Sequence, residues 1–170
     1  MSSIANIKFV ADAMLGTLAK WLRILGYDTH FDPDLDDHQL VRLARAEDRV
    51  LLTRDRDLSR RRGLHVLLVT GERLDAQVAQ VLADLDLVSN QSFSRCPVCN
   101  EPLADADREM VRSRVPAYVA QTHERFKTCP TCQRIYWRGT HWQQMDEQLA
   151  LILERNTPST TEGVYKANSI

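Results

Sequence analysis

Two aspartates follow a short apolar run near the middle of the chain. The run Val50–Leu52 stops at Thr53, and Asp55 and Asp57 come directly after it, each preceded by an arginine. A short continuous apolar run is typical of a buried parallel strand, and ligands of open α/β sheets bind where such strands end. Two carboxylates there indicate a cation site, beside arginines that suit a negatively charged substrate. The alternative is that one of these aspartates only caps the following turn, Leu58–Arg62.

Four cysteines form a second group of residues that could do chemistry. They occur as two Cys-Pro-x-Cys pairs about thirty residues apart, Cys96 with Cys99 and Cys129 with Cys132. Tetrahedral Zn²⁺ accepts four thiolates, and each pair supplies two of them from one tight turn. We therefore predict a closed, structural zinc site. His123 and His141 could substitute as ligands, but a surface or core position is the simpler interpretation of each.

The residues around the second cysteine pair allow two interpretations. Asn100, after the first pair, can adopt the left-handed conformation that ends such a turn, whereas Gln133, after the second, does so less easily. We therefore expect the second turn to be less regular. Tyr136, Trp137 and Trp142 could stack on bases, or they could pack the core of a small unit.

The elements that must position these residues alternate between strand and helix. The patterns predict strands at residues 7–11, 27–31, 50–52 and 66–69, and helices at residues 13–25, 36–48 and 74–85. Gly26 stands where a glycine ends the first helix. This alternation predicts an α/β fold with a parallel sheet flanked by helices. A further helix is expected at residues 143–154, and the polar residues 156–170 are expected to be a disordered tail.

Composition and charge limit the class of protein. The chain has 170 residues and a formal net charge of −1, so any nucleic-acid partner must be recruited by local patches. We read no signal peptide and no apolar stretch long enough for a membrane span. These features predict a cytoplasmic protein with no membrane partner, and they predict no particular oligomeric state.

Aspartates stand after three successive predicted strands. Asp12 ends the first strand, Asp36 or Asp37 opens the second helix, and Asp55 and Asp57 follow the third strand. Because the carboxyl ends of parallel strands meet at one edge, we expect these carboxylates to converge there. Such a cluster could hold Mg²⁺ or Mn²⁺ against a phosphodiester, although each aspartate alone could be a helix cap. Four basic residues are expected to contact the phosphates: Lys20, Arg23, Arg54 and Arg56.

Several motifs resemble the Mut-seven C-terminal ribonuclease family. The resemblance is carried by Phe9–Asp28, Leu51–Leu58, the two Cys-Pro-x-Cys pairs and Tyr136–Trp142. It implies a PIN-like nuclease domain, followed by a zinc ribbon, that uses Mg²⁺ or Mn²⁺ to hydrolyse RNA. Carried over by position, it points to Asp12, Asp37, Asp55 and Asp57 as catalytic metal ligands, with Asp36 as the alternative to Asp37.

These observations lead to one organisation and two candidate functions. We predict a PIN-like nuclease domain at residues 1–90, a zinc ribbon at 91–147, and a terminal helix end with a tail at 148–170. The first function is a metal-dependent ribonuclease. The alternative is a non-catalytic module of the same fold that binds RNA or a ribonucleoprotein.

Overall fold

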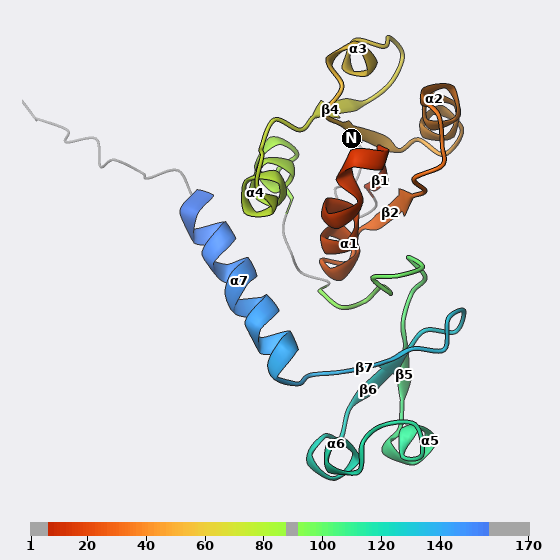
Figure 1. Ribbon diagram of the computed structural model, residues 1–170, viewed down its shortest axis with the longest axis vertical. Helices are drawn as coiled ribbons and strands as arrows, with labels where there is room; N and C mark the ends of the chain where they lie inside the picture. Colours follow the sequence, from red (N-terminus) through yellow and green to blue (C-terminus); the bar gives the residue numbers. More distant parts are fainter. Residues whose placement is uncertain (1–6, 88–91, 157–170) are drawn as a thin grey trace, which may run out of the picture.

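The first part of the chain forms a parallel four-stranded sheet (Figure 1). The computed structural model describes residues 7–87 and 92–156. The strand order is β2-β1-β3-β4, and every neighbouring pair is parallel. The strands are β1 (Lys8–Ala11), β2 (Asp28–Phe31), β3 (Val50–Thr53) and β4 (Val66–Leu68). Because β1 lies between β2 and β3, the carboxyl ends of β1 and β3 are adjacent.

The segment after β1 is two helices where the sequence predicted one. A 3₁₀ turn, η2 (Ala13–Leu15), precedes α1 (Gly16–Ile24). The Asp12 side chain caps η2, and a Cβ placed on Gly16 would lie 2.7 Å from the Phe31 ring, so the helix axis approaches β2 closely at this glycine. Gly26, with φ +97°, follows the end of α1 as predicted.

The sheet is buried on both faces. Phe9 and Leu52 pack with Leu18 and Val78, from α1 and α4 (Leu74–Asp84), in one core. Alternate strand residues point the other way, into a second core beneath α2 (Asp37–Ala46) and the one-turn α3 (Arg56–Ser59). This arrangement confirms the predicted α/β class, because strands covered on both faces read as continuous apolar runs.

The second part is a small antiparallel unit that carries the cysteines. Its sheet contains β5 (Ala104–Ala106), β6 (Phe126–Thr128) and β7 (Ile135–Trp137). Two short helices, α5 (Arg108–Val111) and α6 (Ala117–Thr122), help to bury Phe126 and Val119. We call residues 92–139 the ribbon unit. In Figure 1 it lies at the end of α1 that is remote from η2 and α3.

The last described helix returns the chain to the first part. Helix α7 (Thr140–Asn156) begins three residues before the predicted start, and its Leu149 and Ile152 join the core formed with α1 and α4. It runs through residue 147, where we placed a boundary. The other boundary, at residue 90, and the tail at 157–170 lie outside the described residues. None of the described helices has the length and apolar content needed to cross a membrane.

Candidate functional site

A single hydroxyl connects the carboxyl ends of β1 and β3. Thr53, the last residue of β3, is fully buried, and its Oγ1 donates to Asp12 Oδ2 over 2.7 Å. The same oxygen accepts the backbone N–H of Asp55 at 3.0 Å. The two aspartates that follow neighbouring strands are therefore held in a fixed relation. We did not single out Thr53 from the sequence; a buried hydroxyl that ends an apolar strand just before an acidic loop was the available signal.

Asp12 and Asp55 also act as caps. Asp12 Oδ1 accepts the Met14 N–H at 3.2 Å, and Asp55 Oδ1 accepts the N–H groups of Asp57 and Leu58 at 2.7 and 3.3 Å. The capping roles considered as alternatives are therefore present. They leave room for a cation, because each carboxylate oxygen has two lone pairs and no protein donor among the described residues contacts Asp55 Oδ2.

The two aspartates at the end of the acidic loop after β2 differ in their contacts: Asp36 caps a helix, and the Asp37 carboxylate forms no hydrogen bond or ion pair with a described residue. Asp36 forms a capping box: its Oδ1 accepts the Gln39 N–H at 2.8 Å, and the Gln39 side chain accepts the Asp36 N–H at 2.9 Å. Asp37 is the first residue of α2 and is exposed to solvent. The cap uses one Asp36 oxygen, whereas no described residue bonds to the Asp37 carboxylate, so Asp37 has both oxygens available to a ligand.

The four predicted aspartates do not gather in one compact cluster. Within the described ranges, only the four cysteines bring three or more potential metal-ligand atoms within 4.8 Å of one another. Asp37 follows β2, which β1 separates from β3, and Asp57 is 91% exposed and pairs with Arg60 at 3.4 Å. The Thr53 hydroxyl therefore connects Asp12 to Asp55, and among the described residues no side-chain hydrogen bond connects Asp37 or the Asp57 carboxylate to either of them.

Three of the four predicted phosphate contacts are open to solvent. Lys20 and Arg56 are exposed, and Arg54 is half-buried, next to Asp55. Arg54 and Arg56 flank Asp55 in sequence and follow directly after the carboxyl end of β3. Lys20 projects from the middle of α1, farther from this edge.

The prediction that Arg23 contacts phosphate is wrong. Arg23 is only 7% exposed, and its Nε donates to Thr29 O at 2.9 Å. Its Nη1 donates to the carbonyls of Pro97 and Val98, in the first cysteine turn, at 3.2 and 2.8 Å. Helix α1 carries Arg23 roughly 10 Å along its axis from the end nearest Asp12. The guanidinium therefore joins the first cysteine turn to the sheet.

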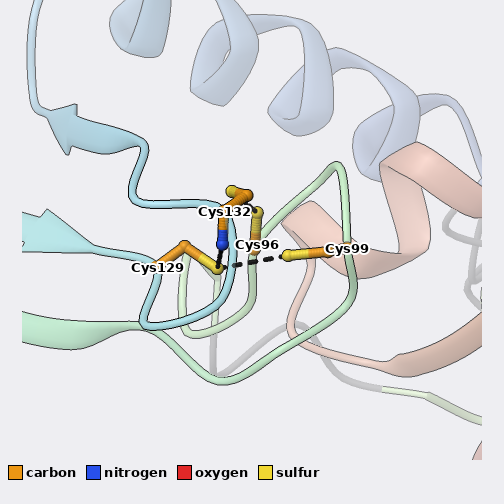
Figure 2. Close-up of side chains that lie close together, drawn as sticks. All are labelled: Cys96, Cys99, Cys129 and Cys132. Atoms are coloured by element: carbon orange, nitrogen blue, oxygen red, sulfur yellow. Dashed lines mark hydrogen bonds between the residues drawn. The ribbon is translucent and has the colours of Figure 1, made fainter.

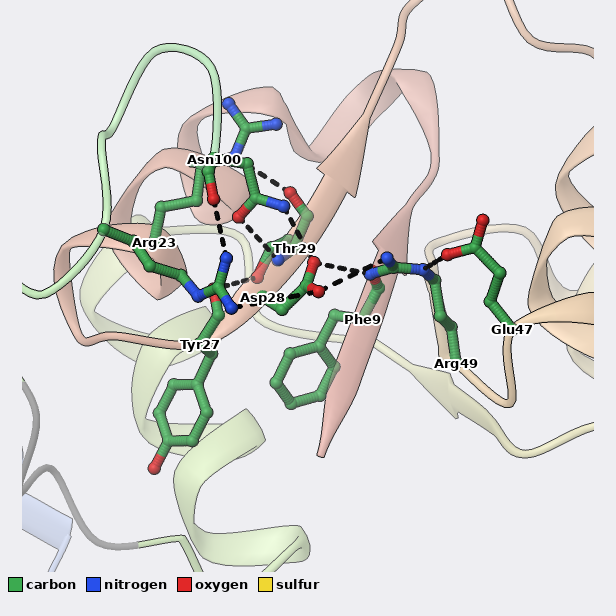
Figure 3. Close-up of polar contacts among 9 residues, drawn as sticks. Phe9, Arg23, Tyr27, Asp28, Thr29, Glu47, Arg49 and Asn100 are labelled. Carbon is green, nitrogen blue, oxygen red and sulfur yellow. Dashed lines mark hydrogen bonds and ion pairs between the residues drawn. The ribbon is translucent and has the colours of Figure 1, made fainter. Parts of the chain in front are cut away.

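Asn100 and Asp28 complete this connection (Figure 3). The Asn100 side chain accepts the Thr29 N–H at 3.0 Å and donates to Asp28 Oδ1 at 2.7 Å. Asp28 also pairs with buried Arg49 at 2.7 Å. Burial opposes ionisation of Asp28, but the hydrogen bonds from Arg49 and Asn100 outweigh it and lower the pKa of Asp28 below its ordinary value. This network lies where the strands begin, at the opposite edge of the sheet from Asp12.

The four cysteines meet at one point (Figure 2). The Sγ atoms of Cys96 and Cys132 are 3.6 Å apart, and those of Cys99 and Cys129 are 3.1 Å apart. Thiolates that bind one tetrahedral zinc lie about 3.8 Å apart, so only small movements separate this arrangement from a zinc site. The four residues are free cysteines. The predicted ligand set is therefore positioned to bind Zn²⁺, and His123 does not belong to the cluster. The side chain of His141 lies outside the described part of the structure.

The two cysteine turns are more alike than the sequence suggested. Asn100 N donates to Cys96 O at 2.9 Å, and Gln133 N donates to Cys129 O at the same distance. Both residues have left-handed backbones, with φ of +67° and +62°. The expectation of a less regular second turn is wrong: Gln133 adopts the required conformation despite its Cβ.

The thiols of this cluster differ in how readily they ionise. Burial opposes ionisation of Cys96, but hydrogen bonds from Tyr136 and from backbone N–H groups lower the pKa of its thiol to about 6. Burial and the neighbouring thiols Cys129 and Cys96 raise the pKa of Cys99 to about 12. Crowded thiols lose their protons in sequence because each new negative charge disfavours the next. A divalent cation at the centre removes this conflict, which is the chemistry of a zinc site.

The aromatic residues near the second pair have structural partners. The Tyr136 hydroxyl lies 3.1 Å from Cys96 Sγ, and Trp137 packs against the ribbon core. Trp142 stacks on Phe93, and its Nε1 donates to Asp146 at 2.9 Å. Of the two interpretations left open by the sequence, the packing role is present in each case.

Fold and site together define a class of protein: a parallel α/β sheet with aspartates at its carboxyl edge, followed by a four-cysteine unit. Residues 7–149 match the family described as the Mut7-C RNAse domain. The chain belongs to this family, as the sequence motifs indicated. No curated protein and no solved structure matches the chain.

Proposed function

We propose that this protein is a metal-dependent ribonuclease that hydrolyses RNA phosphodiester bonds at the edge formed by Asp12 and Asp55. One observation carries the proposal: neighbouring parallel strands of a ribonuclease-family domain each lead into an aspartate, and the buried Thr53 hydroxyl connects the two. The carboxyl edge of an open α/β sheet is where such folds bind their ligands.

The residues at this edge suit Mg²⁺ or Mn²⁺. Mg²⁺ needs only one or two protein carboxylates, because it keeps several waters and binds substrate phosphates directly. Asp12 and Asp55 would supply those carboxylates, and Asp37 and Asp57 would act from the rim, through water. A bound ion would polarise the phosphoryl oxygen and acidify a water molecule.

The protein groups around the ion would orient the reaction. Thr53 donates to Asp12 Oδ2 and so fixes the plane of that carboxylate. Asp55, whose Oδ1 accepts two N–H groups, has its other oxygen free of donors among the described residues. Arg54 and Arg56 flank it and would hold the phosphates on either side of the bond that is cut, with Lys20 farther along the RNA.

A non-catalytic RNA-binding or ribonucleoprotein-binding module is the alternative function. The observation that favours it is that the described aspartates do not form a compact cluster and that Asp12, Asp36 and Asp55 all act as caps. Against it, exposed carboxylates at a phosphate-binding edge repel RNA unless a cation lies between them.

Cleavage of labelled RNA by the purified, zinc-loaded protein tests the proposal. Wild type is compared with Asp12→Asn, Asp55→Asn and a matched control, Glu109→Gln, which removes an exposed carboxylate from α5. We expect cleavage with Mg²⁺ or Mn²⁺ in wild type and control, and its loss in both aspartate variants. Cleavage that persists in the variants would contradict this site. RNA binding without cleavage in wild type would favour the binding module.

A further inference from the structure

Residues of the ribbon unit and of the start of α7 line an open cavity of about 710 Å³. Its walls come from the residues just before the first cysteine turn, from β6 and the loop before it, from β7, and from the first turn of α7. The elements that line it lie at the opposite end of the molecule from α3 in Figure 1, and Asp55 caps α3. The proposed function does not use it.

Positive charge gathers in this cavity although the chain as a whole is nearly neutral. Its walls contain four cationic and two anionic side chains: Arg108, Arg125, Lys127 and Arg138, with Asp105 and Glu124. Lys127 pairs with Asp105 at 3.3 Å, and Arg108 lies 4.0 Å from Glu124. Arg125 and Arg138 are exposed, and neither forms an ion pair with another described residue. Two guanidinium groups are therefore available to an anion.

Aromatic surface lies beside these two arginines. Phe93 and Trp142 stack on each other, and the Arg138 guanidinium lies 5.2 Å from the centre of the Trp142 ring. Trp137 also lines the cavity. Proteins that bind single-stranded nucleic acid without sequence preference use cationic grooves lined with aromatic rings and arginines. The cations contact phosphates, and the rings and guanidinium groups stack on bases.

We propose that this cavity binds a single-stranded segment of the RNA substrate, at a distance from the bond that is cut. The inference rests on the proposed function for the identity of the nucleic acid. Arg125 and Arg138 contact phosphates, and Trp137 and the Arg138–Trp142 pair offer surfaces for bases. Because the cavity and the acidic edge lie at opposite ends of α1, only RNA long enough to reach both gains from it. Short RNA is bound at the acidic edge alone.

The test measures binding of fluorescein-labelled single-stranded RNA by anisotropy, with zinc-loaded protein and no added Mg²⁺ or Mn²⁺. The variant is Arg125→Ala/Arg138→Ala, and the control is Arg73→Ala/Arg112→Ala, which removes two exposed arginines outside the cavity. Loss of two phosphate contacts should weaken binding roughly 25-fold at 0.1 M salt and reduce the slope of log K against log salt by about 1.4. Zinc content and melting temperature confirm that each variant is folded.

The binding and cleavage results together separate this inference from the proposed function. Weaker binding in the cavity variant alone, with Arg138→Lys binding better than Arg138→Ala, supports the inference whether or not wild type cleaves RNA. Equal binding by the cavity variant and the control overturns it. If wild type cleaves RNA, the cavity variant should raise KM for long RNA and leave cleavage of a trinucleotide unchanged. An unchanged KM for long RNA overturns the inference while the proposed function stands.

Discussion

Replacement of Arg23 by alanine should destabilise the zinc-loaded protein and loosen its first cysteine turn. The guanidinium is 7% exposed and donates to three carbonyls, one in the sheet and two in the turn. A hydrogen bond from a charged donor contributes roughly 1.5–3 kcal/mol. We take the lower value for each of the three bonds and reduce the total because water can reach the two part-buried carbonyls of the turn. The expected loss in the free energy of unfolding is then about 3 kcal/mol. For a chain of this size that corresponds to a fall in melting temperature of about 6–12 °C.

Scanning calorimetry of zinc-loaded Arg23→Ala measures this fall, and the rate of zinc transfer to a coloured chelator reports on the turn. Arg42→Ala is the control, because Arg42 is an exposed residue on α2 and its loss should change stability by less than about 0.5 kcal/mol. Zinc transfer should be faster in Arg23→Ala than in the control. Equal melting temperatures and equal transfer rates in the two variants would refute the assignment of Arg23 as the connection between sheet and cysteine turn.

Five further substitutions, one single and two pairs, test other parts of the structure. Because the folded-state pKa of Asp28 is lowered, its ionised form contributes stability at neutral pH that disappears as pH falls through that pKa. Asp28→Asn should therefore melt lower than wild type at pH 7, and the difference should shrink below about pH 4, as followed by calorimetry against pH. Gln133→Gly should raise the free energy of unfolding by roughly 0.5 kcal/mol, because glycine adopts the left-handed backbone at this position without strain. Asn100→Gly, at a similar φ, should lower the free energy of unfolding, because the hydrogen bonds to Asp28 and Thr29 are lost. Urea unfolding that shifts stability in the same direction in both variants would contradict this. Asp36→Ala should cost about 1 kcal/mol of stability with cleavage retained, and Asp37→Ala should do the reverse, with cleavage reduced more than about tenfold.

Features set by local pattern could be predicted from the sequence. Apolar runs followed by polar breaks indicated the four parallel strands, and the spacing of the cysteines indicated the metal-binding turns. Gly26 ends α1 because the left-handed backbone there needs a glycine. The capping box at Asp36 was also readable, since Gln39 stands three positions later, and using it would have favoured Asp37 as the free carboxylate.

Features set by tertiary packing could not be predicted from pattern alone. The sequence around an arginine near an acidic motif is the same whether the side chain binds a phosphate or donates to carbonyls of a distant turn. For this reason the role of Arg23 was predicted wrongly. The Thr53 hydroxyl bridges Asp12 and Asp55 only because β1 and β3 are neighbours in register, which depends on strand order. Leu149 and Ile152 belong to the first core because α7 folds back on α4, a long-range contact without a local signal.

Binding of Mn²⁺ by zinc-loaded protein, followed by electron paramagnetic resonance together with RNA cleavage, tests the central claim most directly. The account predicts that wild type and Glu109→Gln bind Mn²⁺ and that cleavage rises with Mn²⁺ over the same concentration range as occupancy. It predicts that Asp55→Asn weakens binding and abolishes cleavage while it keeps its zinc. Mn²⁺ binding that is unchanged in Asp55→Asn, or cleavage that does not follow occupancy, would contradict a catalytic metal held at the ends of β1 and β3.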